Sequence, residues 1–140
     1  MSHQCKSLIV HCMDFRLGEA IKNWLNENHL LNNCDLVSLA GAVKGLINET
    51  NLKEAQIILK QIEISVSLHG ISQIILMNHT DCGAYGGRES FESSEMEQDT
   101  HVRDMKKAKE VIVQNFPDLE IKLILAKMNP LGQISFEEVA

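Results

Sequence analysis

The sequence has few aromatic residues, no excess of basic residues and no long apolar run. Only 4% of its 140 residues are Phe, Trp or Tyr, and the formal net charge is −6. A nucleic-acid surface usually carries clustered Lys and Arg, so we expect no nucleic-acid partner. The apolar runs are far shorter than the roughly 20 residues needed to cross a bilayer, so we expect no membrane partner either.

The N-terminal segment also lacks the charged start, apolar middle and small-residue cleavage site of a secretory signal. We therefore expect a cytoplasmic protein, whose four cysteines are more often free, metal-bound or catalytic than paired in disulfides. Cys5 lies near the N-terminus and Cys34 lies among polar residues, and we interpret both as ordinary thiols. Cys12 and Cys82 follow apolar runs and need a separate explanation.

Short apolar segments alternate with amphipathic segments along the chain. Apolar residues at helical spacing predict three helices, at residues 17–25, 51–69 and 102–116. Apolar and β-branched runs predict four strands, at residues 7–12, 36–39, 73–78 and 119–128. The only long irregular stretch is expected after Cys82, where glycines, serines and acidic residues gather.

Strands that alternate with helices in this way predict right-handed β-α-β units and a parallel sheet. The chain has 140 residues and no repeat, low-complexity segment or linker, so we expect one α/β domain over residues 1–140. We expect a central, mainly parallel four-stranded sheet flanked by helices, in the order 2-1-3-4 with strands numbered along the chain. Residues 134–139 can add a further strand at one edge.

In that order the first and third strands lie side by side, and the connections that follow them diverge. Ligands of open α/β sheets bind in the crevice at such carboxyl ends. Cys12 ends the first strand, and His79 and Cys82 follow the third. Because a Cys₂His set is one form of catalytic zinc site, with water in the fourth position, we predict that Cys12, His79 and Cys82 bind one Zn²⁺ ion.

Asp14 and Arg16 follow Cys12 at intervals of two residues, so an extended turn brings all three side chains toward the crevice. Asp14 can bind the metal as a fourth ligand and close the site. Alternatively, it can pair with the Arg16 guanidinium and accept a hydrogen bond from bound water. Since two thiolates cancel the charge of the ion, that water should be less acidic than in an all-histidine site, and activity should be highest at alkaline pH.

The other histidines carry weaker signals. His11 precedes Cys12 and should point to the opposite face of its strand, so we interpret it as a core residue or as a group that supports a ligand. His69 and the remaining histidines are scattered and are expected to be structural or exposed. For His101 alone we keep a secondary hypothesis, that it acts as a proton shuttle near the site.

Taken together, the paired motifs resemble those of β-class carbonic anhydrases. The C-x-D-x-R motif of that family matches residues 12–16, and its H-x-x-C-G motif matches residues 79–83. Residues 40–42 are similar to the small-residue loop that follows the second strand of the family, and the resemblance extends over about residues 7–134.

This resemblance implies a zinc lyase that hydrates CO₂ to bicarbonate by a zinc-bound hydroxide, with Asp14 and Arg16 as a gating dyad. Members of the family form dimers or larger assemblies with active sites at the subunit interface, so a homodimer or higher homo-oligomer is expected. The residues implied to line the substrate pocket are Phe15, Ala40, Gly41 and Gly83.

Differences from the family pattern leave other functions open. Phe15 stands where small residues are usual, and Ser38-Leu39 replaces a common Arg-Asn pair. An altered pocket would suit hydrolysis of carbon disulfide or carbonyl sulfide, which close relatives of the fold catalyse. If Asp14 closes the metal permanently, the protein is instead a non-catalytic zinc-binding or regulatory protein.

Overall fold

The computed structural model describes residues 3–140, which form a five-stranded sheet in the order β2-β1-β3-β4-β5. Strands β1 to β4 are parallel, and β5 pairs antiparallel to β4 at one edge. This confirms the predicted α/β fold and strand order, including the additional edge strand. The strands are β1 (Ser7–His11), β2 (Cys34–Ser38), β3 (Gln73–His79), β4 (Glu120–Met128) and β5 (Ile134–Val139).

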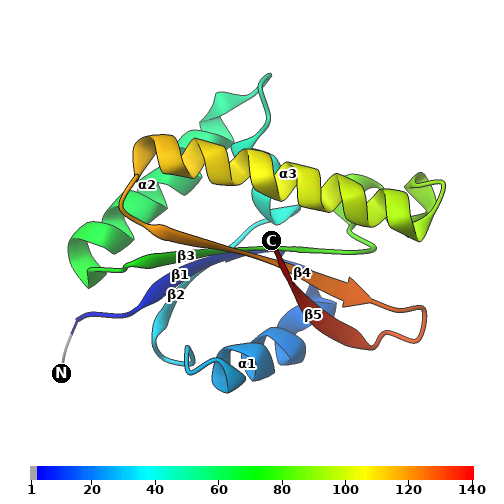
Figure 1. Ribbon diagram of the computed structural model, residues 1–140, viewed down its shortest axis with the longest axis horizontal. Helices are drawn as coiled ribbons and strands as arrows, with labels where there is room; N and C mark the ends of the chain where they lie inside the picture. The colour runs from blue at the N-terminus through cyan, green and yellow to red at the C-terminus, as the bar shows by residue number, and fades with distance from the viewer. Residues whose placement is uncertain (1–2) are drawn as a thin grey trace.

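The helices cover both faces of the sheet. Figure 1 shows α2 and α3 on one face and α1 on the other. Each face carries its own cluster of buried apolar side chains. Among the described residues, no helix has the length and apolar character needed to cross a membrane. The helices are α1 (Gly18–Glu27), α2 (Leu52–His69) and α3 (Ser94–Asn115), with 3₁₀ turns η1 (Phe15–Leu17), η2 (Ala42–Leu46), η3 (Gly83–Tyr85) and η4 (Arg88–Ser90).

Both ends of α2 follow from the sequence. The Asn51 side chain accepts a hydrogen bond from the backbone N–H of Lys53 and caps the first turn. Gly70 adopts the left-handed conformation, with φ of 62°, and its N–H donates to the carbonyl of Val66. The helix therefore ends where the chain turns back into β3.

Helix α3 begins earlier than predicted. It starts at Ser94 instead of near Val102, because the Ser93 side chain accepts a hydrogen bond from the N–H of Met96 and caps the helix. Acidic residues in the first turn, including Glu97, interact favourably with the positive end of the helix dipole. The irregular stretch after Cys82 is consequently shorter than expected.

The pairing of β1 with β3 positions the predicted site. The two strands are parallel neighbours, with His11 opposite Met77. Every residue of β3 is buried, and alternate side chains point to opposite faces of the sheet. His79 therefore shares a face with Met77, on the side of α1, while Asn78 points toward α3. After β1 the chain passes to α1 on one face of the sheet, and after β3 it passes to α3 on the other face (Figure 1).

Candidate metal centre

Two cysteines and one histidine converge at the carboxyl ends of β1 and β3. The sulfurs of Cys12 and Cys82 and a ring nitrogen of His79 all lie within 4.8 Å of one another, and all three residues are buried. The two sulfurs are 3.9 Å apart. The structure thus brings together the three residues expected to be ligands, which we call the buried cluster. Their role as ligands stays a prediction.

The ring of His79 is oriented as a metal ligand requires. Its Nδ1–H donates to the carbonyl of Thr80 at 2.7 Å, which leaves a lone pair on Nε2. Nε2 is buried and has no hydrogen-bond partner among the described residues. Because an unpaired buried polar atom is costly, Nε2 needs a partner that residues 3–140 do not supply. A zinc ion would bind Nε2 together with the two sulfurs, so the donor set fits this metal.

The contact between the two thiols shifts their acidities in opposite directions. Hydrogen bonding to Cys82 is the main effect that lowers the pKa of Cys12, and the same contact raises the pKa of Cys82. A backbone hydrogen bond from Gly41 also favours the thiolate of Cys12. Because zinc binds thiolates, metal binding at this pair should release a proton.

Asp14 and Arg16 form a close pair beside the buried cluster. Oδ1 of Asp14 accepts a hydrogen bond from the backbone N–H of Arg16 at 2.9 Å, and Oδ2 accepts one from Nη2 at 2.7 Å. The side-chain hydrogen bond from Arg16 is the main cause that lowers the pKa of Asp14 to about 2. Oδ2 lies 3.8 Å from Nε2 of His79. Asp14 is thus an ionised carboxylate that Arg16 holds next to the predicted ligands.

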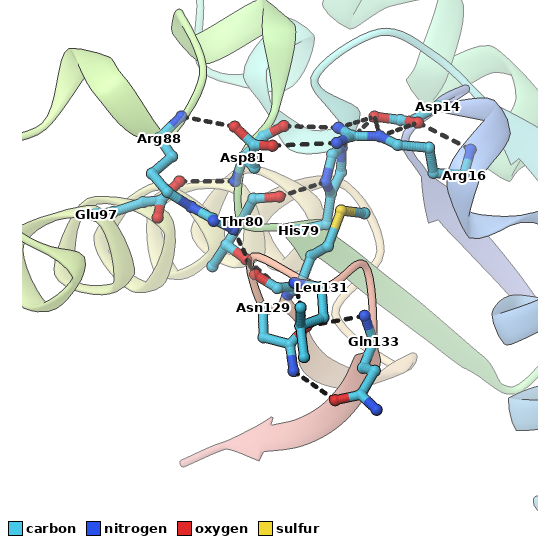
Figure 2. Close-up of polar contacts among 11 residues, drawn as sticks. Asp14, Arg16, His79, Thr80, Asp81, Arg88, Glu97, Asn129, Leu131 and Gln133 are labelled. Atoms are coloured by element: carbon cyan, nitrogen blue, oxygen red, sulfur yellow. Dashed lines mark hydrogen bonds and ion pairs between the residues drawn. The ribbon is translucent and has the colours of Figure 1, made fainter.

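Sequence reasoning missed a second carboxylate on the same guanidinium. Arg16 donates to Oδ2 of Asp81 at 3.0 Å and to its carbonyl at 2.9 Å, so the guanidinium lies between Asp14 and Asp81 (Figure 2). The backbone N–H of Arg88 donates to Oδ1 of Asp81, and the N–H of Asp81 donates to Glu97. The only signal in the sequence was the place of Asp81 inside the H-x-x-C motif.

Cys12 of the buried cluster, together with Asp14 and Arg16, lines a hollow of about 700 Å³. Three residues expected to bind substrate, Phe15, Ala40 and Gly83, lie in its wall. Phe15 is 90% exposed, so its ring stands at the mouth and does not fill the hollow. Gly41 turns the chain beside Ala40 with φ of 79°, where an added Cβ would lie only 3.0 Å from the Cβ of Ala84.

The two histidines given secondary interpretations lie near the site without joining it. Nδ1 of His11 is 2.8 Å from the carbonyl of Cys12, where it supports the backbone next to a predicted ligand. His101 is fully buried, and its Nδ1 accepts a hydrogen bond from the Asn78 amide at 2.9 Å. Burial lowers the pKa of His101 to about 4, which does not favour the shuttle hypothesis.

The chain is similar in sequence to known proteins. The family model described as "Putative carbonic anhydrase" matches residues 2–130. An uncharacterized protein of Rickettsia conorii is 32% identical over an alignment of 138 residues, and the alignment covers 96% of this chain and 74% of that protein. An uncharacterized protein of Rickettsia bellii is 33% identical over an alignment of 138 residues, and the alignment covers 96% of this chain and 84% of that protein.

Solved structures with lower sequence identity share the fold. A carbonic anhydrase from Streptococcus mutans has a TM-score of 0.66 at 19% identity, over 100% of this chain and 86% of that one. The β-carbonic anhydrase isoform I of Trichomonas vaginalis has a TM-score of 0.65 at 16% identity, over 96% of this chain and 83% of that one. A structure of tetrameric β-carbonic anhydrases from Sordaria macrospora has a TM-score of 0.63 at 13% identity, over 100% of this chain and 84% of that one. With its fold shared by β-carbonic anhydrases and the family model matched over most of its length, this chain belongs to the carbonic anhydrase family.

Proposed function

We propose that this protein is a zinc enzyme that catalyses the reversible hydration of CO₂ to bicarbonate. The observation that carries the proposal is the unpartnered Nε2 of His79, which faces two buried thiols beside a carboxylate tied to an arginine. Family membership and fold support the class of reaction. Under this proposal Cys12, His79 and Cys82 hold one zinc ion.

The metal and the Asp14–Arg16 pair have different roles in the proposed reaction. A zinc ion held by the buried cluster supplies an acidified water molecule and so a nucleophile near neutral pH. Asp14 remains ionised at that pH, because Arg16 lowers its pKa to about 2. Its Oδ2 therefore accepts a hydrogen bond and orients a water molecule, but it does not retain a proton. The proton released in the reaction then passes to solvent through the hollow.

The wall of the hollow suits a small uncharged substrate. Ala40 and Ala84 present methyl groups, and Gly83 leaves its backbone accessible where an added Cβ would meet no atom within 4 Å. We assign the backbone N–H of Gly83 as a donor to a substrate oxygen. Phe15 stands at the entrance, and Gly41 holds the turn that places Ala40.

We further propose that the chain forms a homodimer or a higher homo-oligomer with the site near the interface. Met13 and Phe15, at the mouth of the hollow, are 65% and 90% exposed, and such apolar side chains are commonly covered by a partner. One solved neighbour of this fold is described as tetrameric. Light scattering on the purified protein tests this proposal, and a monomer at micromolar concentration would contradict it.

Stopped-flow CO₂ hydration on zinc-loaded protein tests the catalytic proposal. We expect hydration that increases between about pH 7 and about pH 9, since two thiolate ligands make the bound water less acidic than neutral ligands would. Cys82→Ser should abolish zinc binding at the buried cluster and, with it, hydration. Stoichiometric zinc without hydration at either pH, or a flat pH–rate profile, would count against the proposal.

The non-catalytic alternative depends on Asp14. Its Oδ2 is 3.8 Å from Nε2 of His79, so rotation away from Arg16 would let it become a fourth ligand. Zinc affinity of Asp14→Ala separates the two possibilities. An unchanged affinity indicates an open site in which Asp14 is not a ligand, whereas a large loss of affinity indicates a closed one. Carbon disulfide and carbonyl sulfide, offered to the same zinc-loaded protein, test the alternative substrates.

A further inference from the structure

A second group of metal-ligating side chains lies at the opposite end of the sheet. The sulfur of Cys5, a carboxylate oxygen of Asp35 and a ring nitrogen of His69 all lie within 4.8 Å of one another. We call these three residues the outer cluster. They come from three segments, because Cys5 precedes β1, Asp35 lies in β2 and His69 ends α2.

The backbone holds the outer cluster together. The N–H of Cys5 donates to the carbonyl of His69 at 3.0 Å, which joins the start of the chain to the end of α2. Next to it, the N–H of Lys6 donates to the carbonyl of Asn33, just before β2. The three side chains are therefore brought together by main-chain contacts and not by rotamer choice alone.

We propose that Cys5, Asp35 and His69 form a second metal site, which takes a divalent transition-metal ion such as zinc. Thiolate, carboxylate and imidazole are the three kinds of protein ligand that zinc uses. A soft sulfur and a nitrogen in the set favour such an ion over Mg²⁺ or Ca²⁺, which prefer oxygen ligands. The ring centre of His3 lies 6.5 Å from that of His69, so a further imidazole lies close to the outer cluster.

Local charge also favours a cation. The Ser65 hydroxyl donates to Oδ2 of Asp35 at 2.5 Å and fixes the carboxylate. His69 lies at the carbonyl end of α2, an 18-residue helix whose dipole places partial negative charge there.

Metal binding requires one rearrangement at the outer cluster. Nδ1 of His69 and Oδ2 of Asp35 are 2.6 Å apart, closer than the roughly 3.3 Å between two ligands on a tetrahedral zinc ion. The ion must replace this N–H···O hydrogen bond, and the protons on Nδ1 and on the Cys5 thiol must leave. The side chains of Asp35 and His69 are 29% and 35% exposed, so both the ion and the leaving protons have access to solvent.

Metal stoichiometry tests the proposal without reference to catalysis. In the double variant Cys12→Ser/Cys82→Ser, which lacks the thiols of the buried cluster, we expect one equivalent of Zn²⁺ by equilibrium dialysis. Co²⁺ in its place should give a thiolate-to-cobalt charge-transfer band. Adding Cys5→Ser or His69→Gln should remove the band and weaken binding at least 10-fold. The wild-type protein should bind two equivalents, and Cys5→Ser alone should bind one, so the result does not depend on how well the double variant folds.

Cys34→Ser is the matched control. Its thiol neighbours Asp35 in sequence but packs with the apolar cluster on the other face of the sheet, so the substitution should leave both equivalents in place. A wild-type protein that binds one equivalent, unchanged by Cys5→Ser, would overturn the proposal. The Asp35–His69 contact would then be a hydrogen bond only, and the proposal for the buried cluster would be unaffected.

Discussion

The buried cluster and the outer cluster lie at opposite ends of one sheet and differ most in what their ligand atoms already contact. In the buried cluster Nε2 of His79 has no partner among the described residues. In the outer cluster Nδ1 of His69 is already bonded to Asp35. Ligand atoms therefore converge at both ends, but only at the buried cluster is the imidazole nitrogen free of a hydrogen bond among the described residues. Zinc affinity should therefore be higher at the buried cluster. An ion at the outer cluster must first break the hydrogen bond between Asp35 and His69.

The largest effect is expected when one thiol is removed from the buried cluster, and the matching experiment removes one thiol from the outer cluster. Cys82→Ser should lower zinc affinity at the buried cluster well beyond the roughly 10–100-fold that loss of a supporting group causes, and hydration should disappear with it. Cys5→Ser should lower affinity at the outer cluster at least 10-fold and leave hydration unchanged. Competition with a zinc chelator measures both. Equal losses at the two ends would remove the distinction between them.

The next effect concerns the cost of protonating the buried side chain of His101. Burial lowers the pKa of His101 to about 4, below the roughly 6.5 of an unfolded chain. Above about pH 6.5 neither state binds this proton and the full stability is present. As pH falls from about 6.5 to about 4, the unfolded chain gains a proton that the folded chain does not, so stability is lost, by about 2–3 kcal/mol.

Replacing His101 should reduce this loss. The free energy of unfolding of metal-free His101→Gln should fall less between about pH 7 and about pH 4.5 than that of the metal-free wild type. Denaturant unfolding at the two pH values measures the free energy of unfolding of each protein. Subtracting the wild-type change from that of the variant cancels the contribution of the other titrating groups. The same pH dependence in both proteins would show that His101 is not the group responsible.

A smaller effect concerns the carboxylate that holds Arg16 from the side opposite Asp14. Asp81→Asn keeps the backbone carbonyl that Arg16 contacts but removes the charge on Oδ2, so the guanidinium should be less firmly positioned. We expect kcat/KM for CO₂ hydration to fall about 10-fold with zinc stoichiometry unchanged. Asp35→Asn, the corresponding change at the other end, should leave kcat/KM as it is. A loss of zinc in Asp81→Asn would instead indicate that Asp81 supports the ligands themselves.

Much of the fold could be predicted because its signals are local. Apolar runs and helical spacing identified the strands and helices, and Asn51 and Gly70 marked the ends of α2. The start of α3 was missed because its first turns are polar, and the cap at Ser93 carries no apolar pattern. Polar residues are ambiguous in sequence, since the same composition suits a loop or a helix whose polar side contacts other polar groups.

In the candidate sites, too, local patterns could be recognised in the sequence and tertiary contacts could not. Cys12, His79 and Cys82 belong to short motifs at strand ends, so topology alone brought them together. Asp81 and the outer cluster were missed because their partners are set by tertiary contacts. Cys5 and His69 were interpreted as ordinary residues, and no spacing rule connects them across a strand and a helix. Only the backbone contact between them reveals the cluster.

Asp81 also shows where catalysis and folding place opposite demands on one position. It lies between two predicted ligands with φ of 56°, a conformation that glycine adopts with less strain. Glycine there would ease the turn, but it has no carboxylate with which to hold Arg16. In Asp81→Gly we therefore expect less backbone strain at this position and slower CO₂ hydration. At this position, relief of the backbone strain would remove the carboxylate that holds Arg16 beside the predicted ligands.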